Sequence, residues 1–258
     1  MRQDLPPSPG TFPHMRIPSC LAAAGLCLAA QASAQVPAGY AGKPWHDTVQ
    51  AVPGRLEPER YDVGATGATW FDTGPHIGGY TARNPDGVDL DPVKTTDPNV
   101  PGSTVKVVAG NIYWGWLENG EWLKMTVDVK QAGTYAIHGM VGTAMTGTSF
   151  KVDALQGTDS VSSGTLVLPF TGACPVECYH YWNYAKDLGT INLKAGTQVI
   201  RLQIMKSGYN IEYIELALAG GTGARKAAAH AFAPKRGRAF DAQGRKTGTA
   251  SPRRAFAR

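Results

Sequence analysis

Met125-Thr126-Val127-Asp128-Val129 alternates apolar and polar side chains with a period of two residues. Successive side chains of a strand point to opposite faces, so this stretch predicts a half-buried β-strand. The same alternation recurs at residues 199–204 and 211–218. Because no segment sustains a helical period over three turns, we expect an all-β fold.

Clusters of residues that favour turns separate these segments. They are Asn119-Gly120, Gln131-Ala132-Gly133 and Lys194-Ala195-Gly196. Many short strands joined by Gly-rich turns are typical of two stacked sheets, so we predict a β-sandwich of the jelly-roll type. The body that contains them, of roughly 170 residues, has the size of one domain.

Residues 1–34 have the pattern of a cleavable targeting signal. Arg16 supplies positive charge, residues 20–30 form a short run rich in Ala and Leu, and Ala32-Ser33-Ala34 provides the small residues that signal peptidase prefers. We therefore expect cleavage after Ala34 and a secreted or periplasmic protein. The apolar run is shorter than the roughly 20 residues of a spanning helix, so no membrane span is expected. The alternative is a buried N-terminal helix.

The charge of the chain is unevenly distributed between a predicted linker (35–52), a folded body (53–219) and a disordered tail (220–258). The whole chain has a formal net charge of +5, but the tail contains ten Lys or Arg residues and one Asp. Since residues 1–34 contribute +1, residues 35–219 have a net charge of −5. The high pI belongs to the tail, so it is no argument for a nucleic-acid groove in the folded body. We expect no nucleic-acid partner, and we expect a monomer.

Cys174 and Cys178 are the two cysteines outside the predicted signal, which contains Cys20 and Cys27. An exported protein meets oxidising conditions, so this close pair predicts a disulfide that closes a short loop. A zinc site is the alternative, but the sequence lacks a second cysteine pair to complete it.

A series of short motifs over residues 53–219 resembles the family 6 carbohydrate-binding modules. The first, residues 53–62, reads Pro-Gly-Arg-Leu-Glu-Pro-Glu-Arg-Tyr-Asp and is similar to the opening strand of that family. The others follow in the family's order: Gly78-Gly79, Arg83-Asn84, Gly87-Val88-Asp89-Leu90, Gly115-Trp116-Leu117, Gly120-Glu121-Trp122-Leu123, Ala132-Gly133-Thr134-Tyr135, Leu193-Lys194-Ala195-Gly196 and Asn210-Ile211-Glu212-Tyr213-Ile214. The resemblance implies a β-jelly roll that binds polysaccharide or oligosaccharide without catalysis.

Glu57 and Glu59 lie two residues apart in a strand predicted over Arg55–Tyr61, in which Pro58 suits an edge position. Their carboxylates would project from one face, about 7 Å apart, and would either repel each other or share a cation. The resemblance implies a structural calcium ion, an ion that prefers carboxylate oxygens, with Glu215 as a further candidate ligand. Exposed carboxylates without a metal are the alternative.

An aromatic segment follows the predicted disulfide loop and includes Tyr179, Tyr181, Trp182 and Tyr184. Sugar rings stack on aromatic faces, while amide groups bond to the sugar oxygens. The resemblance places Tyr184 where the family has a sugar-stacking aromatic residue, and Asn210 where the family has a sugar-binding amide. We therefore expect Tyr181, Trp182, Tyr184 and Asn210 to contact the ligand.

The second stacking aromatic residue of the family has no direct counterpart, because Ala82 occupies its position. Tyr80 lies two residues earlier on the same strand face and is the expected substitute. Trp116, Trp122 and Tyr135 lie within strand patterns and are predicted to be core residues.

A small glycoside hydrolase or polysaccharide lyase is the first alternative function. A glycosidase needs two carboxylates roughly 5 to 9 Å apart at a cleft, and Glu57 and Glu59 match that spacing without a neighbouring aromatic cleft. No nucleophile elbow, His-rich metal motif or phosphate loop is present, so we expect no enzyme activity. A cell-envelope module that binds other proteins is the second alternative.

Overall fold

The computed structural model describes residues 35–83 and 86–220. Within these residues the regular structure consists of β-strands and four short 3-10 helices, which are η1 (Trp45–Asp47), η2 (Pro58–Arg60), η3 (Thr81–Arg83) and η4 (Cys178–His180). The prediction of an all-β fold is thereby confirmed. The predicted signal peptide and nearly all of the predicted tail lie outside the described residues. No helix in the described ranges is long and apolar enough to cross a membrane.

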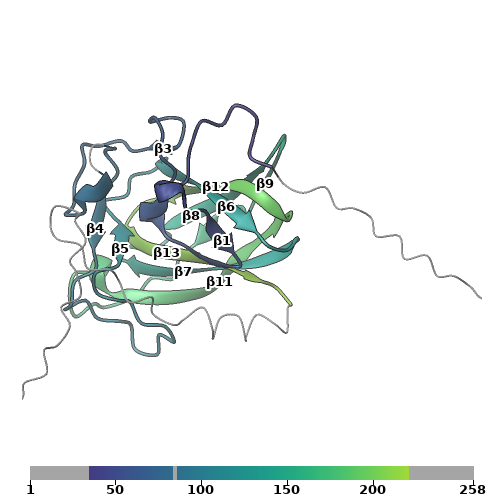
Figure 1. Ribbon diagram of the computed structural model, residues 1–258. Coiled ribbons are helices and arrows are strands. Elements are labelled where there is room, and N and C mark those ends of the chain that lie inside the picture. The colour runs from purple at the N-terminus through teal and green to yellow at the C-terminus, as the bar shows by residue number, and fades with distance from the viewer. Residues whose placement is uncertain (1–34, 84–85, 221–258) are drawn as a thin grey trace, which may run out of the picture. The chain divides into compact units, whose positions relative to one another are not determined.

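Two sheets stack face to face (Figure 1). The first has the order β1 (Gln50–Val52), β6 (Trp122–Val129), β12 (Gly196–Lys206), β8 (Ser149–Gln156) and β10 (Leu166–Val167), with β3 (Trp70–Phe71) paired to β6 and β9 (Asp159–Ser162) paired to β8. The second has the order β11 (Trp182–Leu193), β7 (Gly133–Thr143), β13 (Tyr209–Leu218), β5 (Ile112–Trp114) and β4 (Leu90–Pro92), with β2 (Gly54–Leu56) paired to β13. The predicted β-sandwich is confirmed.

The main core fills the space between the two sheets. Met125, Val127 and Ile200 of the first sheet have no exposed surface, and neither do Ile137 and Leu216 of the second. Each such side chain contributes about 1.5–3 kcal/mol on burial. The period-two alternation at 125–129, 199–204 and 211–218 therefore corresponds to the inward faces of β6, β12 and β13.

A smaller apolar cluster lies on the opposite face of the second sheet. The side chain of Met140 lies on this face of β7, because the side chain of its neighbour Val141 points into the main core. Tyr113 and Trp182 belong to the same cluster, and Val105 and Val107, from the long segment between β4 and β5, pack over it. The sheet is thus covered on both faces, and Tyr113 is fixed in position beneath the loop that follows β5.

The predicted strand Arg55–Tyr61 is wrong in its second half. β2 ends at Leu56, and Pro58 begins the 3-10 helix η2, in which the Tyr61 amide donates to the Pro58 carbonyl at 3.0 Å. Proline suits this position because its fixed φ matches the first helical turn and its missing N–H needs no partner there. Glu57 and Glu59 are therefore not related by strand alternation.

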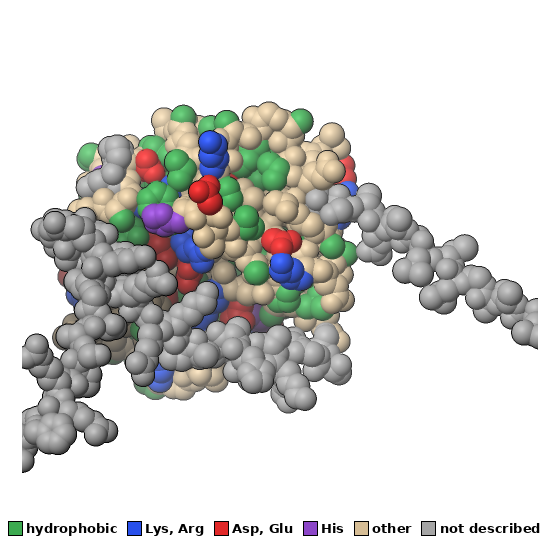
Figure 2. All heavy atoms as spheres, viewed as in Figure 1, with side chains coloured by type: hydrophobic (Ala, Val, Ile, Leu, Met, Phe, Trp, Pro, Cys, Tyr) green, Lys and Arg blue, Asp and Glu red, His purple; other side chains and the backbone are tan. Residues whose placement is uncertain are grey.

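Part of the predicted linker belongs to the folded body. Residues Gln50–Val52 form β1, which pairs in parallel with β6. Upstream of it, the Tyr40 hydroxyl donates to Asp62 at 2.7 Å. Figure 2 shows one face of this body, on which apolar, polar and charged side chains are intermixed.

Candidate functional site

A pocket of about 470 Å³ opens at one end of the sandwich. Its walls come from the loops that follow β5 and β7, from η4, and from the turn between β12 and β13. We call it the Trp116 pocket. The residues that line it are Gly74, Ile77, Asp89, Tyr113, Trp116, Leu117, Glu118, Glu121, Met145, Glu177, Tyr179, His180, Ser207, Gly208, Tyr209 and Asn210.

Trp116 is an exposed aromatic platform in this pocket, with 45% of its surface accessible. One face stacks on Tyr113, with ring centroids 6.3 Å apart and planes inclined by 25°. Tyr113 in turn packs against the buried Trp182 ring at 5.4 Å. The prediction that Trp116 is a core residue is wrong, because it follows the end of β5 in a loop.

The backbone of Trp116 has a φ of 48°, in the left-handed region that bulky residues rarely adopt. Such conformations persist where the surrounding structure imposes them, and they concentrate at binding sites. Here the turn directs the indole ring out of the sandwich, which lets it form a wall of the pocket.

Tyr179 is the second exposed aromatic residue of the pocket, with 40% of its surface accessible. It lies in η4, directly after the disulfide between Cys174 and Cys178, and that predicted disulfide is confirmed. η4 packs tightly on β7: a Cβ atom added to Gly142 would lie 2.2 Å from the Tyr179 carbonyl oxygen. The disulfide and this close approach together hold Tyr179 at the pocket.

Asn210, at the start of β13, supplies a hydrogen-bonding group to the same pocket. Its side chain is 4% exposed, and its Nδ2 donates to the Tyr179 carbonyl at 3.1 Å. Its Oδ1 lies against Gly115, where an added Cβ would come within 3.0 Å, and has no hydrogen-bond donor among the described residues. This oxygen can accept a hydrogen bond from a ligand.

The charged side chains that line the pocket are acidic. They are Asp89, Glu118, Glu121 and Glu177, and neither Lys nor Arg is among the lining residues. Glu121 is buried and fully engaged, because it accepts hydrogen bonds from the Thr73 amide at 3.0 Å, the Thr73 hydroxyl at 2.8 Å and the Glu118 amide at 2.9 Å. It therefore ties two loops of the pocket together.

Asp89 is buried beside Glu121 and accepts a short hydrogen bond from the Ile77 amide. Burial raises the pKa of the Asp89 carboxyl to about 6, with a further contribution from the charge of Glu121. Glu118 and Glu177 are exposed, and in the part of the chain that the structure describes neither forms a salt bridge. These two carboxylates face the solvent at the pocket.

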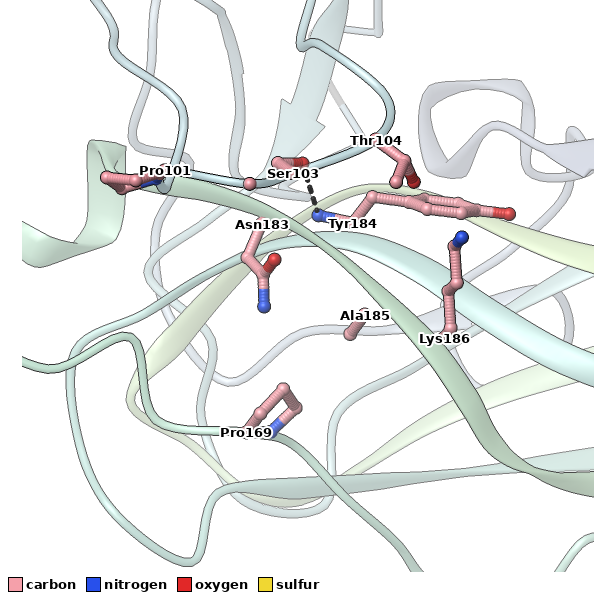
Figure 3. A pocket seen from close by; sticks show the side chains of 9 residues that line it. Pro101, Ser103, Thr104, Pro169, Asn183, Tyr184, Ala185 and Lys186 are labelled. Carbon is pink, nitrogen blue, oxygen red and sulfur yellow. Dashed lines mark hydrogen bonds between the residues drawn. The ribbon is translucent and has the colours of Figure 1, made fainter.

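Tyr184 lies in a different pocket, of about 350 Å³, which is shown in Figure 3. Its amide donates to the Ser103 hydroxyl at 3.2 Å, and its own hydroxyl donates to Glu215 at 2.7 Å. The Lys186 amine approaches the centre of the Tyr184 ring to 5.9 Å. Tyr184 and Asn210 therefore line separate pockets, and the expectation that they share one cleft is not met.

The other aromatic residues predicted to contact the ligand are placed elsewhere. Trp182 has no exposed surface, and its indole N–H donates to Asp97 at 3.2 Å. Tyr181 is also buried, and Tyr80 is half-buried against the main core. None of the three lines the Trp116 pocket, so Asn210 is the one predicted sugar-binding residue that does.

Sequence reasoning missed Trp116 as a surface aromatic residue, and it placed Tyr179 in the aromatic segment without assigning it to the ligand. A signal for Trp116 was available, because it stands between Gly115 and the Asn119-Gly120 turn and so belongs to a loop. Only the structure shows that Trp116, Tyr179 and Asn210 line one pocket.

The profile of a family described as "Carbohydrate binding module (family 6)" matches residues 93–217. These residues form a family 6 carbohydrate-binding module. The resemblance noted in the sequence is confirmed over this range, which includes Trp116, Tyr179 and Asn210. The module binds carbohydrate and is not catalytic. The opening motif at 53–62 lies outside the matched range.

Solved structures of other family 6 modules are similar to the chain. The C-terminal module of LamC from Zobellia galactanivorans is 22% identical, with a TM-score of 0.42, and the match covers 63% of this chain and 97% of that one. The module of Cellvibrio mixtus lichenase 5A, in complex with cellotriose, is 18% identical with a TM-score of 0.42 and coverages of 64% and 96%. A β-1,3-glucan-binding module from Bacillus halodurans is 17% identical with a TM-score of 0.40 and coverages of 66% and 98%. No curated protein matches the chain.

Next to the module, Glu59 is a buried carboxylate for which the charge of Arg60 compensates only in part. Burial and the charges of Glu57 and Glu212 raise its pKa well above the ordinary value, and its Oε2 has no hydrogen-bond partner among the described residues. Glu212 is also buried, which raises its pKa to about 7. Its Oε1 accepts a hydrogen bond from Asn111 at 2.6 Å, while its Oε2 is unpartnered in the described chain.

The structure places Glu212 rather than Glu215 beside Glu59. Glu215, predicted as a third metal ligand, accepts a hydrogen bond from the hydroxyl of Tyr184 at 2.7 Å. In the described ranges no three His, Cys, Asp or Glu side chains are already arranged to hold a metal ion. The unpartnered oxygens of Glu59 and Glu212 nevertheless fit a hard cation, because such groups are costly to bury without one.

Proposed function

We propose that the module binds its polysaccharide or oligosaccharide in the Trp116 pocket. One observation supports this site above the others: two exposed aromatic faces and the free amide oxygen of Asn210 line a single pocket. Trp116 and Tyr179 offer surfaces on which sugar rings stack, and Asn210 Oδ1 accepts a hydroxyl proton. The ordering of Tyr179 by the disulfide loop reduces the entropy lost on binding.

The test is a glycan-array or affinity-gel screen of residues 35–258, followed by titration of single variants. Loss of one stacking platform costs about 1–3 kcal/mol, by analogy with bases that stack on aromatic side chains. Trp116→Ala and Tyr179→Ala should therefore each weaken binding by roughly fivefold to 150-fold. Phe71→Ala is the matched control, because Phe71 is an exposed aromatic residue of β3 that lines neither pocket.

Two outcomes would contradict this location. Binding that survives both aromatic substitutions would show that the ligand lies elsewhere. Loss of binding in Tyr184→Ala alone would move the site to the pocket of Figure 3.

We further propose that the whole chain acts by binding and not by hydrolysis. The family match over residues 93–217 supports this proposal, and the two buried carboxylates of the Trp116 pocket, Asp89 and Glu121, are engaged in holding the Ile77 and Thr73 loops. A general acid or base must instead reach the glycosidic oxygen or the attacking water. Incubation with the bound glycan and assay for new reducing ends tests this proposal, and release of sugar would overturn it.

We propose that Glu57, Glu59 and Glu212 hold a structural calcium ion. The ion would add to the positive charge of Arg55 and Arg60, which lowers the pKa values of Glu212 and Glu59 by less than burial raises them. For Glu57, Arg60 already supplies part of this positive charge, since Glu57 accepts a hydrogen bond from Arg60 at 3.2 Å.

We propose that the protein is exported and begins at Gln35 after cleavage. The disulfide supports this location, because such bonds persist in oxidising compartments. N-terminal sequencing of the protein recovered from the periplasm or medium tests the cleavage site. Recovery in the cytoplasm with an intact N-terminus would contradict it.

A further inference from the structure

We propose that the ligand of the Trp116 pocket is a cationic glycan, whose sugar rings carry free amino groups as in a polymer of glucosamine. This inference rests on the proposed binding site and names its class of ligand. It is carried by the combination of stacking surfaces with acidic groups in the same pocket.

Apart from His180, whose ring Nδ1 lies 3.1 Å from Asp97 Oδ2, the charged residues that line the pocket are all acidic. Glu118 and Glu177 are exposed carboxylates of its lining, Asp89 and Glu121 lie buried behind them, and the lining includes no Lys or Arg. The exposed pair forms no salt bridge within the described residues, so its charge is not cancelled at close range. An ammonium group would supply the missing positive charge, and a uronate or sulfate group would be repelled.

The amide of Asn210 favours the same ligand. Its Nδ2 is already committed to the Tyr179 carbonyl, and its unpartnered Oδ1 can only accept a hydrogen bond. An ammonium group has three donors and no acceptor, so it suits a pocket in which the fixed amide and the carboxylates are all acceptors. The aromatic platforms add to this attraction, because cations are drawn to the face of an indole ring.

The acidity is specific to this pocket and does not simply reflect the net negative charge of the folded body. The pocket of Figure 3 has one charged residue in its lining, Lys186, which is basic. Two openings of the same body therefore differ in the sign of their charge.

The test compares oligosaccharides of one length that differ in the group on each ring. The full mature chain is titrated calorimetrically with a glucosamine oligomer, its fully N-acetylated counterpart and a galacturonate oligomer, at about pH 6, which is below the ordinary pKa of an amine. We expect the glucosamine oligomer to bind at least about tenfold more tightly than the acetylated one. Each titration is repeated with Trp116→Ala, so that binding to the basic tail is subtracted.

Glu118→Gln combined with Glu177→Gln should reduce the ratio of the two affinities toward one. Asp128→Asn combined with Asp159→Asn is the matched control, because it removes the same charge from acids that line neither pocket, and the ratio should persist. Equal affinities for the two oligomers, a preference for the acetylated oligomer, or a ratio that survives the glutamate substitutions would overturn the cationic ligand. In those cases Trp116-dependent binding of a neutral glycan would leave the proposed function intact, whereas failure to bind any glycan would overturn both.

Discussion

At the scale of single residues, the pocket depends on residues held in energetically unfavourable conformations or environments. Trp116 adopts a left-handed backbone, and Gly115 before it leaves room for its neighbours. A Cβ atom at Gly115 would come within 2.8 Å of the Tyr113 ring and 3.0 Å of Asn210 Oδ1. Glycine at this position therefore allows the platform, its support and the amide to lie together.

Asp72 is a second residue in an unfavourable environment, close to the buried acids Asp89 and Glu121 of the pocket. Burial, together with the charges of Glu121 and Asp89, raises its pKa from 3.8 to about 7. The folded state therefore holds this proton more tightly than the unfolded chain, so the contribution of Asp72 to stability falls as the pH rises from about 4 to about 7.

We predict that Asp72→Asn raises the melting temperature at pH 8 and changes it less at pH 5. Asparagine has the same shape, and its Oδ1 can keep the hydrogen bond that Asp72 accepts from the Gly74 amide at 3.1 Å. It lacks the charge that is unfavourable above pH 7. Thermal melts of both proteins at the two pH values measure the effect, and a lower melting temperature at pH 8 would show that the Asp72 charge stabilises the fold.

At the scale of elements, η4 and its disulfide present Tyr179 to the pocket. Closure of so short a loop restricts the unfolded chain only modestly, by about 2 kcal/mol at most. Its effect on the ligand is expected to be larger, because Tyr179 directly follows Cys178 and must be positioned for stacking.

We predict that Cys174→Ser with Cys178→Ser weakens glycan binding more than it lowers the melting temperature. Calorimetric titration and thermal melts of the same preparation compare the two effects. Phe71→Ala again serves as the control, because it leaves η4 untouched. Unchanged affinity in the double variant would mean that the bond is a structural staple remote from the ligand.

Features that arise from residues close together in the sequence could be predicted, whereas features that arise from contacts between distant residues could not. The strands β6, β12 and β13 follow from alternation in the sequence, and the disulfide follows from two nearby cysteines and the expected compartment. The site did not follow, because Tyr184 lies five residues from Tyr179 yet lines another pocket. Which aromatic ring is exposed depends on how the segment between β4 and β5 packs on the second sheet. Local sequence patterns do not predict that long-range contact.

At the scale of the whole molecule, three carboxylates from two distant parts of the chain lie close together beside the second sheet. Glu57 and Glu59 flank Pro58 after β2, and Glu212 comes from the register shift in β13. Pairing of β2 with β13 brings these segments together. The fold therefore brings acidic groups together in a place where Glu59 and Glu212 are both buried. An ion bound there would link the segment that follows β2 to β13.

We predict that calcium raises the melting temperature and that a chelator lowers it. An ion that binds only the native state stabilises it by about 2.7 kcal/mol at a concentration one hundred times its Kd. For a domain of this size, that corresponds to a shift of roughly 5–10 °C. Glu59→Gln combined with Glu212→Gln should abolish the shift, because the neutral amides no longer require a cation and bind one weakly. Glu215→Gln should retain it, because Glu215 is paired with Tyr184. Melts that coincide with and without chelator, or a shift that persists in the Glu59 and Glu212 variant, would show that no calcium is held by these residues.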